Sequence, residues 1–201
     1  YSRFLQKEEL SEKQYREYVD IICLSVERLN FLSENMIKIS RLETGLIHLK
    51  CQKNKISETV LKAVKDIYPK ARHMGCEIIY REDREKELWA QFDADWTAEA
   101  IFNMLDNAVK YSENAQNKRI ILSVRKLGLF AEISVEDQNG FIPEEEKNRI
   151  FQRFYRGENS EGKEGIGLGL YLTREIALRQ GGYVSVKGTE QGNIFSIYLR
   201  L

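Results

Sequence analysis

The feature that most constrains the fold is a long stretch, residues 7–43, that contains neither glycine nor proline. It predicts one continuous helix, about 55 Å long at a rise of about 1.5 Å per residue. Mostly apolar residues recur along it every seven positions in two interleaved rows, which are Tyr15, Ile22, Leu29 and Met36, and Tyr18, Ser25, Leu32 and Ile39. This is the a/d pattern of helices that pack side by side, interrupted only at Ser25.

The apolar stripe is wider than a two-stranded seam, because Val19, Ile21 and Val26 lie beside it. A helix hairpin or a four-helix bundle is therefore favoured over a lone coiled coil, and the alternative is a long helix that lies on its own globular domain. Gly45 is expected to end the helix in a left-handed conformation. We therefore expect two domains, residues 1–45 and 46–201.

Beyond Gly45 the sequence predicts alternating short strands and helices. Strands are expected at 46–51, 76–80, 89–93, 119–126, 129–136, 183–187 and 194–199. Helices are expected from an N-cap at Ser57 to before Gly75, from an N-cap at Asp95 to Ser112, over 143–155 and over 169–180. Helices alternating with antiparallel hairpins predict an α+β sandwich.

Composition excludes several functions. The 201 residues carry 31 Lys plus Arg and 31 Asp plus Glu, so no excess positive charge favours nucleic acid or an anionic membrane. No apolar run approaches the roughly 20 residues that a membrane-spanning helix needs. Three cysteines without a C-x-x-C pair indicate buried free thiols in a reducing compartment. A start at Tyr1 without a leader suggests a piece of a longer protein.

One face of the helix expected over residues 95–112 is polar. At a spacing of i, i+4, i+7 and i+8 it carries Asn103, Asn107, Lys110 and Tyr111. An amide oxygen is a suitable Mg²⁺ ligand, and a lysine ammonium suits phosphate. The pattern indicates a phosphate and metal site, and a plain amphipathic helix is the alternative.

Unusual backbone geometry is concentrated after residue 137, where most of the 13 glycines lie. Asp137 ends an expected strand, where its carboxylate can accept from the amino group of a base or simply cap the turn. The segment GIGLGL at 165–170 places three glycines directly before a helix, so its backbone N–H groups can approach a phosphate. Its spacing is neither that of a P-loop nor that of a dinucleotide-binding turn.

The order of these segments resembles that of a sensor histidine kinase. SRLETG at 40–45 is similar to the end of the dimerisation helix, NMLDNAVKYS at 103–112 to the N box, and DQNGFIP at 137–143 to the G1 box. IFQRFYRG at 150–157 is similar to the F box, GIGLGL at 165–170 to the G2 box, and GNIF at 192–195 to the last glycine box. The resemblance implies an α/β two-layer ATP-binding domain of the Bergerat type, attached to a helical dimerisation domain.

The resemblance also implies roles toward ATP and Mg²⁺. Asn107 would hold Mg²⁺, Asn103 would support the phosphate site, Lys110 would meet phosphate, and Tyr111 would pack at the nucleotide. Arg156 would reach the γ-phosphate, so that Asn107, Lys110 and Arg156 form the catalytic set.

At the base, the resemblance implies that Asp137 accepts from the adenine amino group. The other nucleotide-binding positions implied by the motifs are Ile142, Phe154, Gly165, Ile166, Gly167, Leu168, Gly169 and Leu170. Residues 157–164 would form a lid over the triphosphate, or else a plain surface loop.

Two departures from the family pattern stand out. The phosphoacceptor histidine, followed in the family by an acid and a Thr-Pro pair, matches neither His48 nor His73. We expect the acceptor upstream of Tyr1, so the chain should not label itself. In the G1 box, Asn139 and Phe141 stand where the family has glycines, and Phe141 is expected to narrow the nucleotide pocket, fold outward or fill it.

The predicted function is the ATP-binding kinase core of a two-component sensor histidine kinase, which passes the γ-phosphoryl group to a histidine and on to an aspartate of a response-regulator receiver domain. The alternative is a degenerate kinase that dimerises and docks the regulator, with weak or no nucleotide binding; a chaperone-like or topoisomerase-like ATPase is a third hypothesis. The resemblance implies a homodimer of the full-length protein and a cytoplasmic location, with a membrane anchor outside these residues. No contact of these residues with membrane or nucleic acid is expected.

Overall fold

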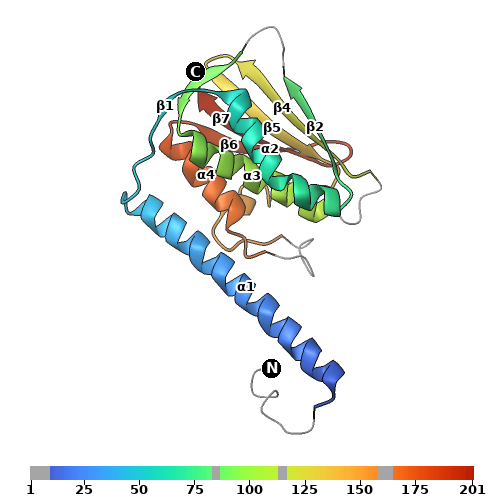
Figure 1. The fold of residues 1–201 in the computed structure, drawn as a ribbon. Coiled ribbons are helices and arrows are strands. Elements are labelled where there is room, and N and C mark those ends of the chain that lie inside the picture. The colour runs from blue at the N-terminus through green and yellow to red at the C-terminus, as the bar shows by residue number, and fades with distance from the viewer. Residues whose placement is uncertain (1–9, 83–86, 113–116, 158–164) are drawn as a thin grey trace. The chain divides into compact units, whose positions relative to one another are not determined.

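The computed structural model describes residues 10–82, 87–112, 117–157 and 165–201 (Figure 1). Two compact units are distinguished, of which the first ends at Ile47 and the second spans His48–Leu201. No helix among the described ranges combines the length and apolarity that crossing a bilayer requires.

The first unit contains the long helix α1, Glu12–Glu43. It begins later than the expected residue 7, because Ser11 and Gln14 form a capping box: Gln14 N donates to Ser11 Oγ (3.3 Å) and Ser11 N donates to Gln14 Oε1 (3.1 Å). Gly45 has φ +71°, so its expected left-handed conformation is confirmed. Tyr15 and Leu29, two members of the heptad rows, are exposed.

The second unit is a two-layer arrangement of one mixed sheet and helices. The five-stranded sheet has the order β2-β4-β5-β7-β6, with β2 parallel to β4 and the other pairs antiparallel. Figure 1 shows α2, α3 and α4 together on one face of this sheet. The elements are β1 (Gln52–Lys55), α2 (Ile56–His73), β2 (Glu77–Glu82), β3 (Trp89–Phe92), α3 (Ala94–Tyr111), β4 (Arg119–Leu127), β5 (Phe130–Asp137), η2 (Arg149–Phe151), α4 (Gly169–Arg179), β6 (Tyr183–Gly188) and β7 (Asn193–Arg200).

The core lies between the helices and the sheet. Alternate residues of β4, such as Leu122 and Val124, are buried together with Ile101 and Leu105 of α3. Burial of alternate strand residues is the pattern of a sheet that is covered on one face by helices. The predicted α+β class with a long N-terminal helix is confirmed.

The region before α2 differs from the prediction. Residues 46–51 are irregular rather than a strand, and Lys50 N donates to the Asp93 carboxylate (2.7 Å) instead of to a neighbouring strand. The strand β1 begins only at Gln52, where it pairs with β3 in a separate two-stranded sheet. Helix α2 then begins at Ile56 with Lys55 at the N-cap, so the cap expected at Ser57 is wrong.

Asp93, rather than Asp95, caps α3. Its Oδ1 accepts from the backbone nitrogens of Asp95 and Trp96, both at 3.1 Å. Asp95 therefore lies in the first turn, where a negative charge still favours the helix N-terminus.

The helix expected over 143–155 is also wrong. This segment consists of turns and the short 3₁₀ helix η2. Phe154 has φ +62°, and its backbone nitrogen donates to Gly167 O (3.0 Å), which an α-helix would not permit. A contact with the glycine-rich segment therefore replaces the helical pairing.

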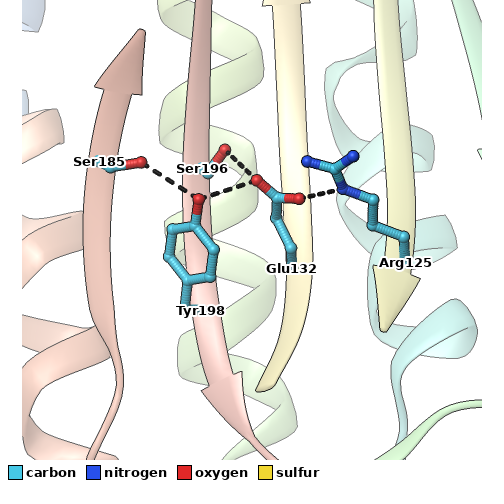
Figure 2. Close-up of polar contacts among 5 residues, drawn as sticks. All are labelled: Arg125, Glu132, Ser185, Ser196 and Tyr198. Carbon is cyan, nitrogen blue, oxygen red and sulfur yellow. Dashed lines mark hydrogen bonds and ion pairs between the residues drawn. The ribbon is translucent and has the colours of Figure 1, made fainter. Parts of the chain in front are cut away.

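On the sheet face opposite the helices, a row of polar residues crosses four strands (Figure 2). Its centre is Glu132, which is 2% exposed. Oε1 of Glu132 accepts from Tyr198 Oη (2.8 Å) and Ser196 Oγ (3.1 Å), and Oε2 pairs with Arg125 Nε. Ser185 Oγ lies 3.4 Å from Tyr198 Oη and completes the row. The buried carboxylate is thus neutralised and hydrogen-bonded.

Candidate functional site

Helix α3 is divided into an apolar and a polar face, as its sequence predicts. Ile101 and Leu105 are fully buried, whereas Asn103, Asn107 and Lys110 are half-buried. The Asn107 side chain makes no hydrogen bond with any residue that the structure describes, and it is not sealed from solvent. Its amide oxygen is therefore available to a ligand.

The glycine-rich segment 165–170 lies against this polar face. A β-carbon built on Gly165 would lie 2.4 Å from Lys110 Nζ, and one built on Gly169 would lie 3.4 Å from Asn103 Oδ1. Gly165 also has φ +129°. The Lys110 side chain could move away from a larger residue, but side chains other than glycine rarely adopt this φ, so the backbone conformation at position 165 favours glycine.

Gly167 connects the segment to the residues before the undescribed range 158–164. A β-carbon on Gly167 would lie 2.4 Å from Tyr155 O, and Gly167 O accepts from Phe154 N (3.0 Å). Arg156 is exposed and lies two residues beyond Phe154, whose side chain is also exposed. The predicted lid falls almost entirely outside the described residues.

The N-terminus of α4 also lies against the polar face of α3, because Gly169, its first residue, contacts Asn103. Leu168 occupies the N-cap and makes no side-chain capping bond, while Ile166 and Leu170 are half-buried beside it. A helix start without a side-chain cap retains backbone N–H groups and partial positive charge for an anion. Beside it, Nδ2 of Asn103 is buried without a partner among the described residues.

Asp137 lies at the end of β5 and is 3% exposed. Its Oδ1 accepts from Asn139 N (3.2 Å), Asn193 N (3.2 Å) and Asn193 Nδ2 (3.4 Å). Burial raises the pKa of Asp137 above its ordinary value, and these hydrogen bonds only partly oppose the effect. No lysine or arginine in the described ranges pairs with this carboxylate.

Asn193 is a site residue that sequence reasoning missed. Besides holding Asp137, it donates to Gly140 O (2.7 Å) and accepts from Ile142 N (3.2 Å). It therefore fixes the whole turn that follows Asp137. The available signal was its place in GNIF, directly after Gly192, whose backbone lies too close to Asp137 O to allow a β-carbon.

Phe141 and Asn139, the two residues of this turn that depart from the family pattern, occupy different environments. Phe141 folds outward: its side chain is 59% exposed, a β-carbon on Gly188 would lie 3.0 Å from its ring, and Lys147 Nζ lies 5.8 Å from the ring centroid. Of the three outcomes expected for Phe141, the outward position is the one found. Gly140, rather than Asn139, has the positive φ (+73°).

Asn139 instead joins the turn to α3. Its Nδ2 donates to Ala108 O (2.9 Å), and its Oδ1 is buried without a partner among the described residues. Asn139 thus links Asp137, through its backbone nitrogen, to the α3 backbone, through its side chain. Two unpaired buried amide atoms, here and at Asn103, are a cost that a bound ligand or water can remove.

The histidines and cysteines do not contribute to this arrangement. His48 and His73 are exposed and lie before β1 and at the end of α2. Cys23 and Cys51 are exposed, so the expectation of buried thiols is wrong for both. Within the described ranges no group of His, Cys, Asp and Glu is arranged to hold a metal ion.

Comparison with known proteins gives a family match over residues 92–201, to the family described as histidine kinase-, DNA gyrase B- and HSP90-like ATPase. A circadian input-output histidine kinase, CikA, of Synechococcus elongatus is 28% identical over 194 residues, 94% of this chain and 25% of that protein. The histidine-protein kinase/phosphatase MprB of Mycolicibacterium smegmatis is 36% identical over 106 residues, 52% of this chain and 21% of that protein. The chain thus spans a quarter or less of these relatives.

Solved structures share the fold. Histidine kinase ThkA in complex with response regulator protein TrrA matches with TM-score 0.78 at 20% identity, over 99% of this chain and 55% of that one. Full-length ShkA in complex with AMPPNP matches with TM-score 0.76 at 23% identity, over 98% of this chain and 40% of that one. The resemblance indicated by the ordered sequence motifs is confirmed.

Proposed function

Because the chain belongs to the family of histidine kinase-, DNA gyrase B- and HSP90-like ATPases, we propose that it is the ATP-binding kinase core of a two-component sensor histidine kinase. The observation that carries the proposal is the contact of Gly165 and Gly169 with Lys110 and Asn103, beside the buried Asp137. This arrangement combines donors for phosphate with an acceptor for a base. We assign residues 46–201 to the catalytic domain and 1–45 to part of the dimerisation domain.

Recognition of adenine is assigned to Asp137. Its carboxylate is buried, carries no paired cation among the described residues and is held in place by Asn193. A buried acceptor of this kind favours an amino group over a carbonyl, because a carbonyl would leave both acceptors unpaired. Adenine, which carries an amino group at C6 where guanine carries a carbonyl, is therefore favoured over guanine.

The phosphates and Mg²⁺ are assigned to α3 and the glycine-rich segment. Asn107 fits Mg²⁺ because its amide oxygen is accessible and has no hydrogen-bond partner in the described part of the chain. A single amide is a sparse ligand set, which is consistent with an ion that keeps several waters and phosphate oxygens. The bound ion would neutralise phosphate charge during transfer.

Lys110 would hold phosphate oxygens, and Asn103 with the N–H groups at the start of α4 would complete their binding. Tyr111 would pack at the nucleotide, and Arg156 would approach the γ-phosphate. Ile142, Phe154, Ile166, Gly167, Leu168 and Leu170 would line the remainder of the site.

The phosphoryl acceptor is assigned to a histidine outside these 201 residues, followed by an aspartate of a response-regulator receiver domain. ThkA, which shares this fold, was solved in a complex with the response regulator protein TrrA, and this supports such a partner. Three apolar residues of one heptad row of α1, Tyr15, Leu29 and Met36, are exposed, which supports dimerisation. We also propose a cytoplasmic location, with a membrane anchor supplied by other segments of the protein.

Calorimetric titration with ATP, with and without Mg²⁺, tests the proposal. Saturable Mg²⁺-dependent binding that is lost in Asn107→Ala, with Asp106→Asn on the same helix as the matched control, is the expected result. Wild-type affinity in Asn107→Ala would contradict the metal assignment. Absence of binding to folded wild-type protein would favour the degenerate docking module, although the outward position of Phe141 removes the main reason for that alternative.

A further inference from the structure

An open groove of about 520 Å³ lies along the free edge of the sheet. One wall consists of three consecutive residues of β6, Val184–Val186. The other wall is formed by Lys147 in the turns that lead into η2, by Phe151 of η2 itself, and by Arg174 of α4. None of these residues belongs to the proposed nucleotide site.

The strand β6 is the end of the sheet. In the described part of the chain it pairs with β7 alone, so alternate N–H and C=O groups along its other side have no strand partner. Edge strands are commonly protected by proline or by several charges. Over Tyr183–Gly188 there is no proline, and Lys187 is the single charged residue.

The groove also has an apolar floor. Val184 and Val186 pair with Ile197 and Phe195, which are buried in the core, so both valines face the helix layer. Phe151 is almost fully buried and lines the same groove. Backbone groups for a strand and a surface for an apolar side chain therefore lie next to each other.

The positive charge in the groove indicates what kind of ligand it would bind. Arg174 is exposed and makes no hydrogen bond or ion pair with a described residue. Lys147 differs, because its ammonium pairs with Glu144 and lies 5.8 Å from the centroid of the Phe141 ring. The uncompensated charge of the groove is thus the Arg174 guanidinium, which favours a carboxylate.

We propose that this groove binds an extended acidic segment of a partner protein, which adds to the sheet as a strand beside β6 and places a carboxylate at Arg174. Side chains of a strand alternate between its faces, so the apolar residue over Phe151 and the acidic residue at Arg174 are an even number of positions apart. Main-chain hydrogen bonds between the partner strand and β6 supply affinity, and the pairing of Arg174 with the carboxylate supplies specificity.

The test uses the full chain, labelled with ¹⁵N and titrated with a short acetylated peptide of alternating valine and threonine with one central glutamate. Saturable shifts of the Val184–Val186 amides are expected, and Arg174→Glu should weaken the affinity about tenfold or more. Arg200→Glu on β7, the same change outside the groove, should bind as wild type does. A peptide N-methylated along its pairing edge should not bind.

A second peptide with lysine in place of glutamate should bind wild type weakly and recover affinity toward Arg174→Glu. Equal binding of both peptides to both proteins, or no saturable shift at peptide concentrations up to about 1 mM, would overturn the proposal. Shifts of Val184–Val186 that depend on protein concentration without peptide would show a second copy of the chain at this edge, which also overturns it. ATP titration of Arg174→Glu, expected to match wild type, separates this proposal from the nucleotide site.

Discussion

Two buried carboxylates on the same strand, Glu132 and Asp137 of β5, are treated differently by the protein. They are 2% and 3% exposed, and their odd separation puts them on opposite faces of the sheet. Although burial alone would raise the pKa of Glu132, hydrogen bonds from Arg125, Tyr198 and Ser196 hold this pKa below its ordinary value. Burial raises the pKa of Asp137, which has amide donors but no cation in the described ranges.

The opposite pKa shifts distinguish a carboxylate with a structural role from one that can bind a ligand. Glu132 is fully satisfied within the fold (Figure 2), so its burial is compensated before any ligand binds. Asp137 keeps an uncompensated desolvation cost, which a ligand that donates a hydrogen bond can reduce.

The largest effect on stability is expected for Glu132→Ala. Loss of the ion pair and two hydrogen bonds should lower the free energy of unfolding by about 3 kcal/mol, as measured by urea denaturation. Glu136→Ala, on the same face of β5, is the matched control and should cost about 0.5 kcal/mol. Equal losses in the two variants would mean that the ion pair and hydrogen bonds of Glu132 make no specific contribution to stability.

Asp137→Asn should act mainly on ligand binding. The dissociation constant for ATP should rise about 100-fold, because the new amide brings its own N–H groups toward the adenine amino group. Calorimetry measures this change, with Glu132→Gln as the control that keeps wild-type affinity. An unchanged dissociation constant in Asp137→Asn would place the base elsewhere.

Opposite pH dependences should distinguish the two carboxylates. Since the pKa of Glu132 is lowered on folding, its stabilising contribution is present above its unfolded pKa and is lost as pH falls through the folded value. Since the pKa of Asp137 is raised on folding, its contribution is present below its unfolded pKa and is lost as pH rises through the folded value.

The test measures the unfolding free energy of wild type, Glu132→Gln and Asp137→Asn across the acid pH range. The stability advantage of wild type over each variant is then followed with pH. The wild-type advantage over Glu132→Gln should shrink below pH about 4, and that over Asp137→Asn should shrink above it. If both wild-type advantages changed with pH in the same direction, the contrast between the two carboxylates would be refuted.

The smallest effect is expected for Ser196→Ala. Removing one of the donors to Glu132 should cost about 1 kcal/mol in urea denaturation, because Arg125 and Tyr198 remain. Ser134→Ala provides the comparison, since Ser134 is the register partner of Ser196 on the neighbouring strand and should be near neutral.

Features that depend on local periodicity could be predicted from the sequence. The two faces of α3, the strands β4 and β5, and the start of α4 at Gly169 follow from patterns within a few residues. The helix expected over 143–155 failed because a distant carbonyl, Gly167 O, takes the Phe154 N–H and holds that residue at positive φ. Local preference cannot anticipate such a partner.

The sequence by itself determined the α+β class, the long helix and which residue types gather near Asp137 and α3, because spacing and composition act over short distances. Only the tertiary structure decided that Asn193 holds Asp137, since the register of β5 against β7 brings these residues together. It also decided the outward position of Phe141 and the opposite environments of Glu132 and Asp137. Those outcomes depend on which donors the folded chain places beside each group.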